Sequence, residues 1–246
     1  MNIDKKYYQE INENLTNTIQ DTNISAPNKK VGKVRDAYFL NDKVVMISTD
    51  RQSAFDRVLA AIPYKGAVLN SVSAWWFKKT EHLFPNHLIS TPDPNVSIVE
   101  KCTVFPVEFV VRGYITGTTD TSLWTVYNNG DREYCGNSLP EGLKKNDKLD
   151  KPMLTPTTKD KVHDRPVSRE EIIDLGLMSA EDYDLAAKMS LDLFAFGQET
   201  AKKNGLILVD TKYEIGTDSK GKIKFVDEIH TPDSSRFWIS GSYKER

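Results

Sequence analysis

The sequence predicts an α+β fold in two lobes, a β-rich N-terminal lobe over residues 1–105 and a larger α/β lobe over residues 106–246. Alternating apolar and polar residues, typical of strands, dominate the first half of the chain. In the second half, a long helical pattern leads into two apolar runs joined by a turn. Strands and helices grouped in this way are typical of α+β folds.

The N-terminal lobe is predicted to begin with a helix and to continue mainly as strands. Ile3, Tyr7, Ile11, Leu15 and Ile19 recur every four residues and would share one face of an amphipathic helix. After it we expect two paired strands, a helix and a third strand, over residues 30–39, 43–49, 66–80 and 96–104.

The second lobe is predicted to open with a strand over residues 107–111. The polar, lysine-rich stretch 128–152 is expected to form a surface excursion. Ser168 and Ser179 each begin a sequence similar to a capping box, which predicts the starts of two helices. The second helix is expected to end near Gly205 and to bury four apolar side chains, Ala186, Met189, Leu193 and Phe196.

The most informative element is a predicted hairpin over residues 206–227. Strand alternation places Asp210, Lys212 and Glu214 on one face of its first strand. Carboxylates and a lysine at the rim of a buried hairpin suit a magnesium nucleotide, because Mg²⁺ takes oxygen ligands. A solvated strand face is the alternative that spacing alone leaves open.

Composition limits the class of protein. The 246 residues are 39% hydrophobic and 28% charged, which is typical of a soluble globular protein. The net charge of -2 argues against nucleic acid as a partner. Two cysteines in unlike contexts, Cys102 and Cys135, predict a reducing, cytoplasmic location. No signal-like or membrane-spanning apolar run occurs, so no membrane partner is expected.

Two candidate motifs lie in the first lobe. Lys33 and Arg35, in the sequence GKVRD, would share a strand face about 7 Å apart, which suits phosphate oxygens. An exposed basic edge strand is the alternative. Residues 48–51 and 53–56 follow a predicted strand, where Ser and Asp serve either a site or the turn backbone.

Three further candidate motifs lie in the second lobe. Glu108 and Arg112 occupy one face of an apolar strand, where each needs a charged partner or a ligand, and a mutual ion pair is the alternative. His163 beside Asp164 suggests a general base or a carboxylate-binding group, or else local capping. Arg236, in a loop rich in hydroxyl groups, suits two-pronged contact with a phosphate.

Taken in order, these motifs resemble the SAICAR synthetases of purine biosynthesis. Six motifs carry the resemblance: GKVRD, STDRQSAFD, VVRGYITGT, PTTKDKVHD, LVDTKYEIG and DEIHTPDSSRFW. The resemblance implies an ATP-dependent ligase that joins L-aspartate to the carboxyaminoimidazole ribotide CAIR through an acyl phosphate, giving SAICAR, ADP and phosphate. It also implies a nucleotide cleft like that of kinases and ATP-grasp enzymes.

The resemblance also implies roles for individual residues. Contacts with ATP would come from five residues, Lys33, Arg35, Lys101, Glu108 and Lys159. The ribotide and its reacting group would be bound by Arg112, Thr118, Asp233 and Arg236. Catalytic roles would fall to Asp56, His163, Asp210 and Lys212, and Mg²⁺ would be held by Glu214 and Asp227.

Simple pairing around a turn at residues 217–221 places Lys224 opposite Glu214 and Asp227 opposite Thr211. The two proposed metal ligands would then face opposite sides, so a shared ion requires a bulge or another register. Family members also continue into a helical C-terminal segment, which the resemblance implies is missing from this chain after Arg246.

Two other functions use the same features. A small-molecule kinase would use the Mg-ATP cleft with an alcohol acceptor, and a non-catalytic nucleotide-binding module would need no second anion site. Dependence on aspartate separates the ligase from the kinase. The sequence does not decide the oligomeric state, although a monomer is favoured.

Overall fold

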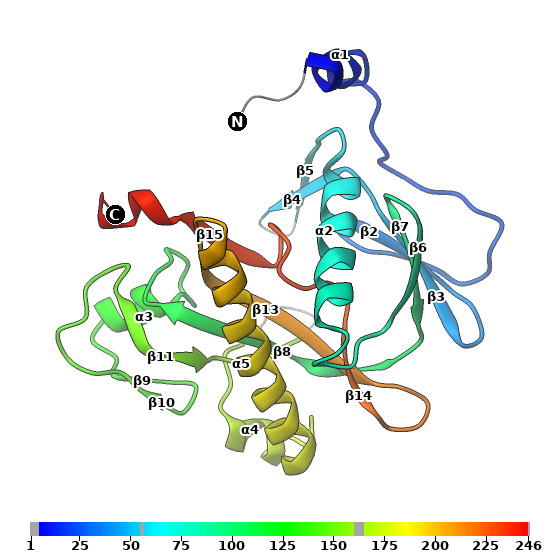
Figure 1. Cartoon of the computed structure of the whole chain (residues 1–246). Helices are drawn as coiled ribbons and strands as arrows, with labels where there is room; N and C mark the ends of the chain where they lie inside the picture. Colours follow the sequence, from blue (N-terminus) through cyan, green and yellow to red (C-terminus); the bar gives the residue numbers. More distant parts are fainter. Residues whose placement is uncertain (1–4, 55–56, 160–164, 246) are drawn as a thin grey trace. The chain divides into compact units, whose positions relative to one another are not determined.

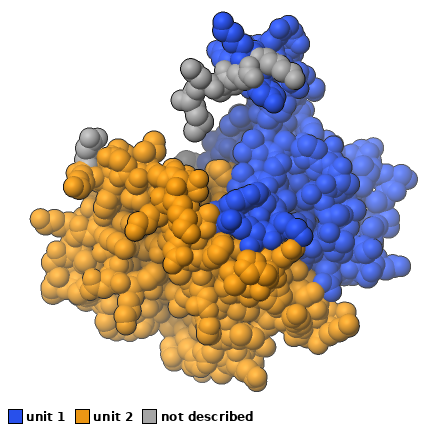
Figure 2. Space-filling model, viewed as in Figure 1, with its two compact units in different colours: residues 1–79, 87–101 blue, residues 80–86, 102–246 orange. Residues whose placement is uncertain are grey.

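The computed structural model describes residues 5–54, 57–159 and 165–245 (Figure 1). The chain forms two compact units, coloured separately in Figure 2. Unit 1 comprises residues 1–79 and 87–101, and unit 2 comprises residues 80–86 and 102–246, whereas the sequence predicts a division between residues 105 and 106. Antiparallel sheets with separate helices confirm the α+β prediction.

Unit 1 is built on a five-stranded sheet of order β1-β2-β3-β7-β6. Its strands are β1 (Lys29–Val31), β2 (Arg35–Phe39), β3 (Lys43–Ser48), β6 (Leu88–Asp93) and β7 (Val96–Glu100). A separate hairpin pairs β4 (Arg51–Ala54) with β5 (Arg57–Ala61). The predicted pairing of residues 30–39 with 43–49 is confirmed for β2 and β3, but residues 29–31 form a separate strand, β1, that pairs with β2.

Helix α2 (Lys65–Thr80) confirms the helix predicted over 66–80. Asn70 fastens it to the sheet, since its side chain donates to Pro94 O at 2.9 Å and accepts from Ser97 Oγ at 2.6 Å. At the start of the helix, a Cβ on Gly66 would lie 2.3 Å from Ser48 O, so only glycine fits there. The helix therefore begins in close contact with the end of β3.

The predicted opening helix is shorter than the apolar pattern suggested. Helix α1 spans only Lys5–Glu13, and Tyr7, Ile11 and Leu15 are exposed. The expected continuation to Ile19 is wrong because the backbone of that residue bonds to Asp50 instead. Its N–H donates to the Asp50 carboxylate at 2.8 Å, and its carbonyl accepts from the Asp50 N–H at 2.8 Å. These bonds replace the helical ones.

Unit 2 is built on β8 (Thr103–Tyr114) and β13 (Leu206–Thr217), two adjacent antiparallel strands. They are flanked by β11 (Lys148–Leu154), β12 (Thr157–Thr158), β14 (Ile223–Val226) and β15 (Ser235–Ile239). The predicted strand ending at residue 104 is wrong, because β7 stops at Glu100 and β8 already includes residue 103. Pro106 lies within β8 where the pairing with β13 shifts register, and a proline is tolerated at such an irregularity.

Helix α5 (Ala180–Lys203) lies against β8 and β13, as Figure 1 shows. Ser179 caps it by accepting from the Asp182 N–H. Ser168 and Glu171 form the predicted capping box at the start of α4 (Arg169–Asp174). Of the four side chains expected in the core, Phe196 is only half-buried, and Phe194 is fully buried in its place.

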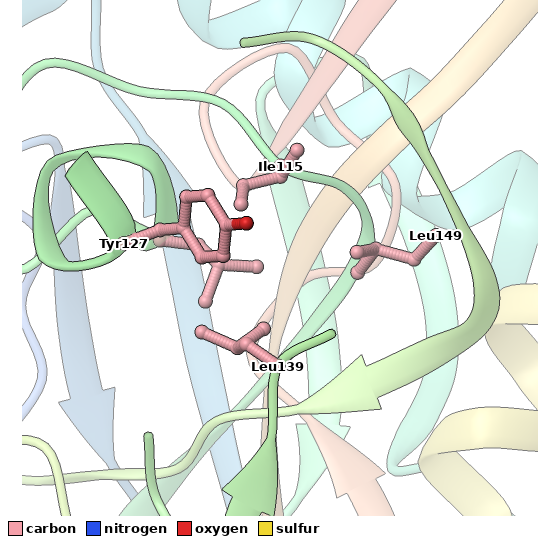
Figure 3. Close-up of a cluster of buried hydrophobic side chains, with 5 residues drawn as sticks. Ile115, Tyr127, Leu139 and Leu149 are labelled. Carbon is pink, nitrogen blue, oxygen red and sulfur yellow. The ribbon is translucent and has the colours of Figure 1, made fainter. Parts of the chain in front are cut away.

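The stretch 128–152 is more than a surface excursion, which corrects the sequence interpretation. It follows α3 (Leu123–Asn128) and contains β9 (Glu133–Tyr134) and β10 (Asn137–Ser138), which pair as a short hairpin. Figure 3 shows Ile115, Tyr127, Leu139 and Leu149 converging in a buried cluster. Leu139 and Leu149 belong to the polar stretch, so this stretch contributes to a small hydrophobic cluster together with residues that precede it.

The β13–β14 hairpin has a different register from the one derived by simple pairing. Glu214 lies opposite Val226, and Gly216 lies opposite Lys224. Asp218 explains the shift, because its carboxylate accepts from the N–H groups of residues 220 and 222, each at 2.9 Å. Asp218 also forms an ion pair with Lys224 at 3.0 Å. The centre of the turn is therefore one residue later in the chain than simple pairing predicted.

Candidate active site

A row of charged side chains follows the paired strands β8 and β13. Asp210 lies opposite Arg112, and Glu214 lies opposite Glu108, so the two charged faces predicted from alternation meet across the ladder. Along β13, the step from Asp210 to Glu214 spans about 13 Å at the usual rise per residue. The face therefore has two ends, and Lys212 lies between them.

At the middle of this face, Lys212 Nζ forms an ion pair with Glu108 Oε1 at 2.8 Å. Burial alone would lower the pKa of Lys212, but the carboxylates of Glu108, Glu214 and Asp227 together raise it. Lys212 is therefore a stable cation at neutral pH. Glu108 has this partner rather than Arg112, so the alternative of a mutual Glu108–Arg112 pair is wrong.

At one end of the face, Glu214 and Asp227 come close together. Asp227 directly follows β14 and has φ of 63°, a left-handed conformation that takes the chain out of the strand. Burial, and then the Asp227 carboxylate, raise the pKa of Glu214, while Lys159 and Lys212 oppose the rise. Glu214 forms an ion pair with Lys159. The observed register alone would still leave Asp227 facing away from Glu214; the two carboxylates come together because Asp227 lies beyond the end of β14 in a left-handed conformation.

At the other end of the face, Asp210 lies between two arginines. It is the cross-strand partner of Arg112 on β8 and of Arg236 on β15. Arg236 donates through Nε and Nη2 to both carboxylate oxygens, and the Nε–Oδ1 distance is 2.8 Å. Two guanidinium groups against one carboxylate leave a net positive charge, which suits a phosphate.

Arg112 is held more firmly than Arg236. It is 9% exposed, and its Nε donates to Thr155 Oγ1 at 2.8 Å. Burial lowers the pKa of Arg112, with Asp210 opposing and Arg236 reinforcing that change. The Arg236 side chain is 46% exposed and so has more freedom to turn toward a ligand. Thr155 was not singled out as an individual residue from the sequence, although it lies beside the motif PTTKDKVHD.

The other predicted site residues are placed as follows. Lys33 lies in the turn between β1 and β2 of unit 1 and Arg35 is the first residue of β2, so the prediction that they share a strand face is wrong. Lys101, also in unit 1, lines a pocket of about 430 Å³ with Asn28 and Phe39. Thr118 and Asp233 are exposed in loops of unit 2, and Asp56 and His163, like Asp164, fall outside the described residues.

The loop 227–234 is fixed by buried hydrogen bonds that the sequence did not reveal. Thr231 Oγ1 donates to Glu228 Oε2 at 2.5 Å and accepts from the Ser234 N–H at 3.1 Å. His230 is left-handed, with φ of 53°, and its Nε2 lies 2.5 Å from Tyr213 OH. Tyr213 occupies the buried face of β13, so alternation indicated its burial but not its partner.

His230 should make stability sensitive to acid. Burial lowers the pKa of His230 to about 3. Below about pH 6.5 the unfolded chain binds a proton that the folded protein does not, so the free energy of unfolding falls by about 1.4 kcal/mol per pH unit. We expect His230→Gln to remove this slope between pH 6 and 4 in urea unfolding. The exposed His82 provides the control, and equal slopes in His230→Gln and His82→Gln would contradict the assignment.

The chain is similar in sequence to one family of known proteins over most of its length. Residues 28–246 match the sequence profile of one family, SAICAR synthetase. The chain is 58% identical over 228 residues to the phosphoribosylaminoimidazole-succinocarboxamide synthase of Legionella pneumophila (strain Lens), covering 93% of this chain and 73% of that protein.

Two solved structures are similar in fold as well as in sequence. One is described as SAICAR-synthase from Saccharomyces cerevisiae complexed with SAICAR, with a TM-score of 0.80, 33% identity and coverage of 92% of this chain and 81% of that one. Another is a SAICAR synthetase in complex with ADP, with a TM-score of 0.75, 27% identity and coverage of 88% and 86%. Among the described residues, no helix is long and apolar enough to cross a membrane.

Proposed function

Because this chain belongs to the SAICAR synthetase family, whose members are ATP-dependent ligases of purine biosynthesis, we propose that the charged face of β8 and β13 is its active site. The two ends of that face differ in charge. A carboxylate pair with lysines lies at the Glu214 end, and a guanidinium pair lies at the Asp210 end. This separation of an acidic end from a basic end is the observation that carries the proposal.

The reaction joins an amine to a carboxylate, which does not occur directly because the carboxylate oxygen is a poor leaving group. Transfer of the γ-phosphoryl group of ATP to the CAIR carboxylate releases ADP and forms an acyl phosphate. The amine of L-aspartate then attacks the acyl carbon, phosphate leaves, and the amine loses a proton. The protein contributes by positioning the reactants and by neutralising charge.

The guanidinium end suits the ribotide phosphate. Arg112, held by Thr155, offers a fixed cation, and the more exposed Arg236 can turn from Asp210 to the phosphate. That movement would release the Asp210 carboxylate to accept the proton of the aspartate amine. The family resemblance also assigns Thr118 and Asp233 to this substrate and His163 and Asp56 to catalysis.

The carboxylate end suits a magnesium nucleotide. Glu214 and Asp227 supply the oxygen ligands that Mg²⁺ prefers, and a bound cation would relieve the repulsion that raises the pKa of Glu214. Such an ion would neutralise charge on the phosphates. Lys159 and Lys212 lie beside these carboxylates and would contact the transferred phosphoryl group. Lys33, Arg35, Lys101 and Glu108 are assigned to the nucleotide from the family resemblance.

Release of ADP with each substrate omitted in turn tests the proposed function. We expect ADP and an amide product only when Mg-ATP, CAIR and L-aspartate are all present. ADP release that needs CAIR but not aspartate, with a stable phosphorylated product, would instead support a small-molecule kinase. ATP binding with no turnover under any combination would favour a non-catalytic nucleotide-binding module.

A further inference from the structure

Arg51 is a buried cation in unit 1 that the proposed chemistry does not use. Its side chain is 9% exposed, and its guanidinium donates four hydrogen bonds. Nε donates to Lys33 O at 3.1 Å, and Nη2 donates to Gly32 O at 3.0 Å and to Asp36 Oδ1 at 2.8 Å. Nη1 donates to Gln20 O at 2.6 Å. Three of the four acceptors belong to the hairpin between β1 and β2.

These contacts orient the backbone at the tip of that hairpin. The carbonyls of Gly32 and Lys33 both point at Arg51, and the next carbonyl, Val34 O, accepts from Thr49 N at 2.9 Å and from Thr49 Oγ1 at 2.8 Å. In a planar trans peptide, each C=O points opposite to the N–H of the following residue. The N–H groups of Lys33 and Val34 are therefore directed away from Arg51. Successive N–H groups turned to one side form a concavity for an anion.

The ion pair beneath the hairpin is stable at neutral pH. Asp36 is fully buried and accepts from Arg51, from Thr22 Oγ1 at 2.7 Å and from Lys29 Nζ at 3.1 Å. Burial alone would raise the pKa of Asp36, but these hydrogen bonds hold it below its ordinary value. Arg51 consequently keeps a charged partner, and its remaining donors stay directed at the hairpin carbonyls.

We propose that Arg51 is a positioning residue for nucleotide phosphate binding, because it fixes the Gly32 and Lys33 carbonyls and thereby turns the hairpin N–H groups and side chains toward the phosphates. The inference rests on the proposed function, which assigns Lys33 and Arg35 to ATP. Lysine cannot replace Arg51, because a single ammonium group lacks the planar fork that reaches separate acceptors. Arg51 itself does not touch the nucleotide.

Calorimetric affinities for ATP, ADP and adenosine, each measured for wild type and Arg51→Lys, test the inference. We expect the variant to bind ATP and ADP about tenfold more weakly or worse, because small misplacements of binding groups have large effects. Its affinity for adenosine and its KM for CAIR should be unchanged. Arg169→Lys is the matched control, since Arg169 pairs through two nitrogens with Asp184 on the surface of unit 2.

Each alternative outcome has a distinct meaning. Equal weakening of ATP, ADP and adenosine would show a merely structural role for Arg51 and overturn the inference. If wild type prefers ATP to adenosine and the variant keeps that preference, the inference alone fails. If wild type shows no such preference, the assignment of the hairpin to phosphates fails too. If Arg51→Lys does not fold, Thr49→Val tests the inference instead, because it removes only the Oγ1 bond to Val34 O. This variant should bind ATP more weakly but adenosine with unchanged affinity.

Discussion

Replacing Arg112 with leucine should lower kcat/KM for CAIR by about two orders of magnitude and leave the affinity for ATP unchanged. Loss of one buried charged partner of an anion costs about 2–5 kcal/mol, and each 1.4 kcal/mol is a factor of ten. The fold should survive, because Asp210 keeps its bonds to Arg236 and is not left as an uncompensated buried carboxylate. Steady-state kinetics with each substrate varied, together with calorimetric ATP binding, measure both quantities.

The matched control is Arg132→Leu, which removes an arginine whose ion pair with Glu141 lies at the surface. That change should leave kcat/KM within about twofold of wild type, because such exposed pairs contribute little. If Arg112→Leu weakened ATP and CAIR equally, the division of the face into a nucleotide end and a ribotide end would be wrong. A normal KM for CAIR would remove Arg112 from the phosphate site.

Replacing Glu214 with glutamine should raise the Mg²⁺ concentration needed for half-maximal activity and reduce turnover, each by about tenfold or more. The neutral amide is a weaker ligand of nearly the same size. Because burial and Asp227 raise the pKa of Glu214, its ionised form costs the folded state stability at neutral pH. Without Mg²⁺, the variant should therefore unfold at a temperature no lower than that of wild type.

Thermal unfolding with increasing Mg²⁺ distinguishes a metal ligand from a structural carboxylate. Wild type should gain stability as Mg²⁺ binds the folded state, and Glu214→Gln should lose most of this gain. Glu199→Gln, on the exposed side of α5, should respond like wild type. An unchanged magnesium dependence in Glu214→Gln would exclude this residue from the metal site.

Much of the fold followed from local patterns. The capping box at Ser168, the helix at residues 65–80 and the shared face of Asp210, Lys212 and Glu214 depend on residues near one another in sequence. Local hydrogen bonds, 3.6-residue periodicity and strand alternation act over such short spans. The apolar repeat at the N-terminus predicted a helix that is too long, because the backbone N–H and C=O of Ile19 bond to Asp50, a residue distant in sequence.

The sequence by itself determined that the chain has an α+β fold, that its charged residues line one face of each of two strands, and to which family it belongs. The tertiary structure decided which charges meet: Lys212 with Glu108, Asp210 with Arg236, and Glu214 with Asp227. The registers of β13 with β8 and with β15 set the first two pairs, and the left-handed Asp227, just beyond β14, brings the third together. Alternation assigns a side chain to a face, but it contains no information about which residue of another strand lies opposite.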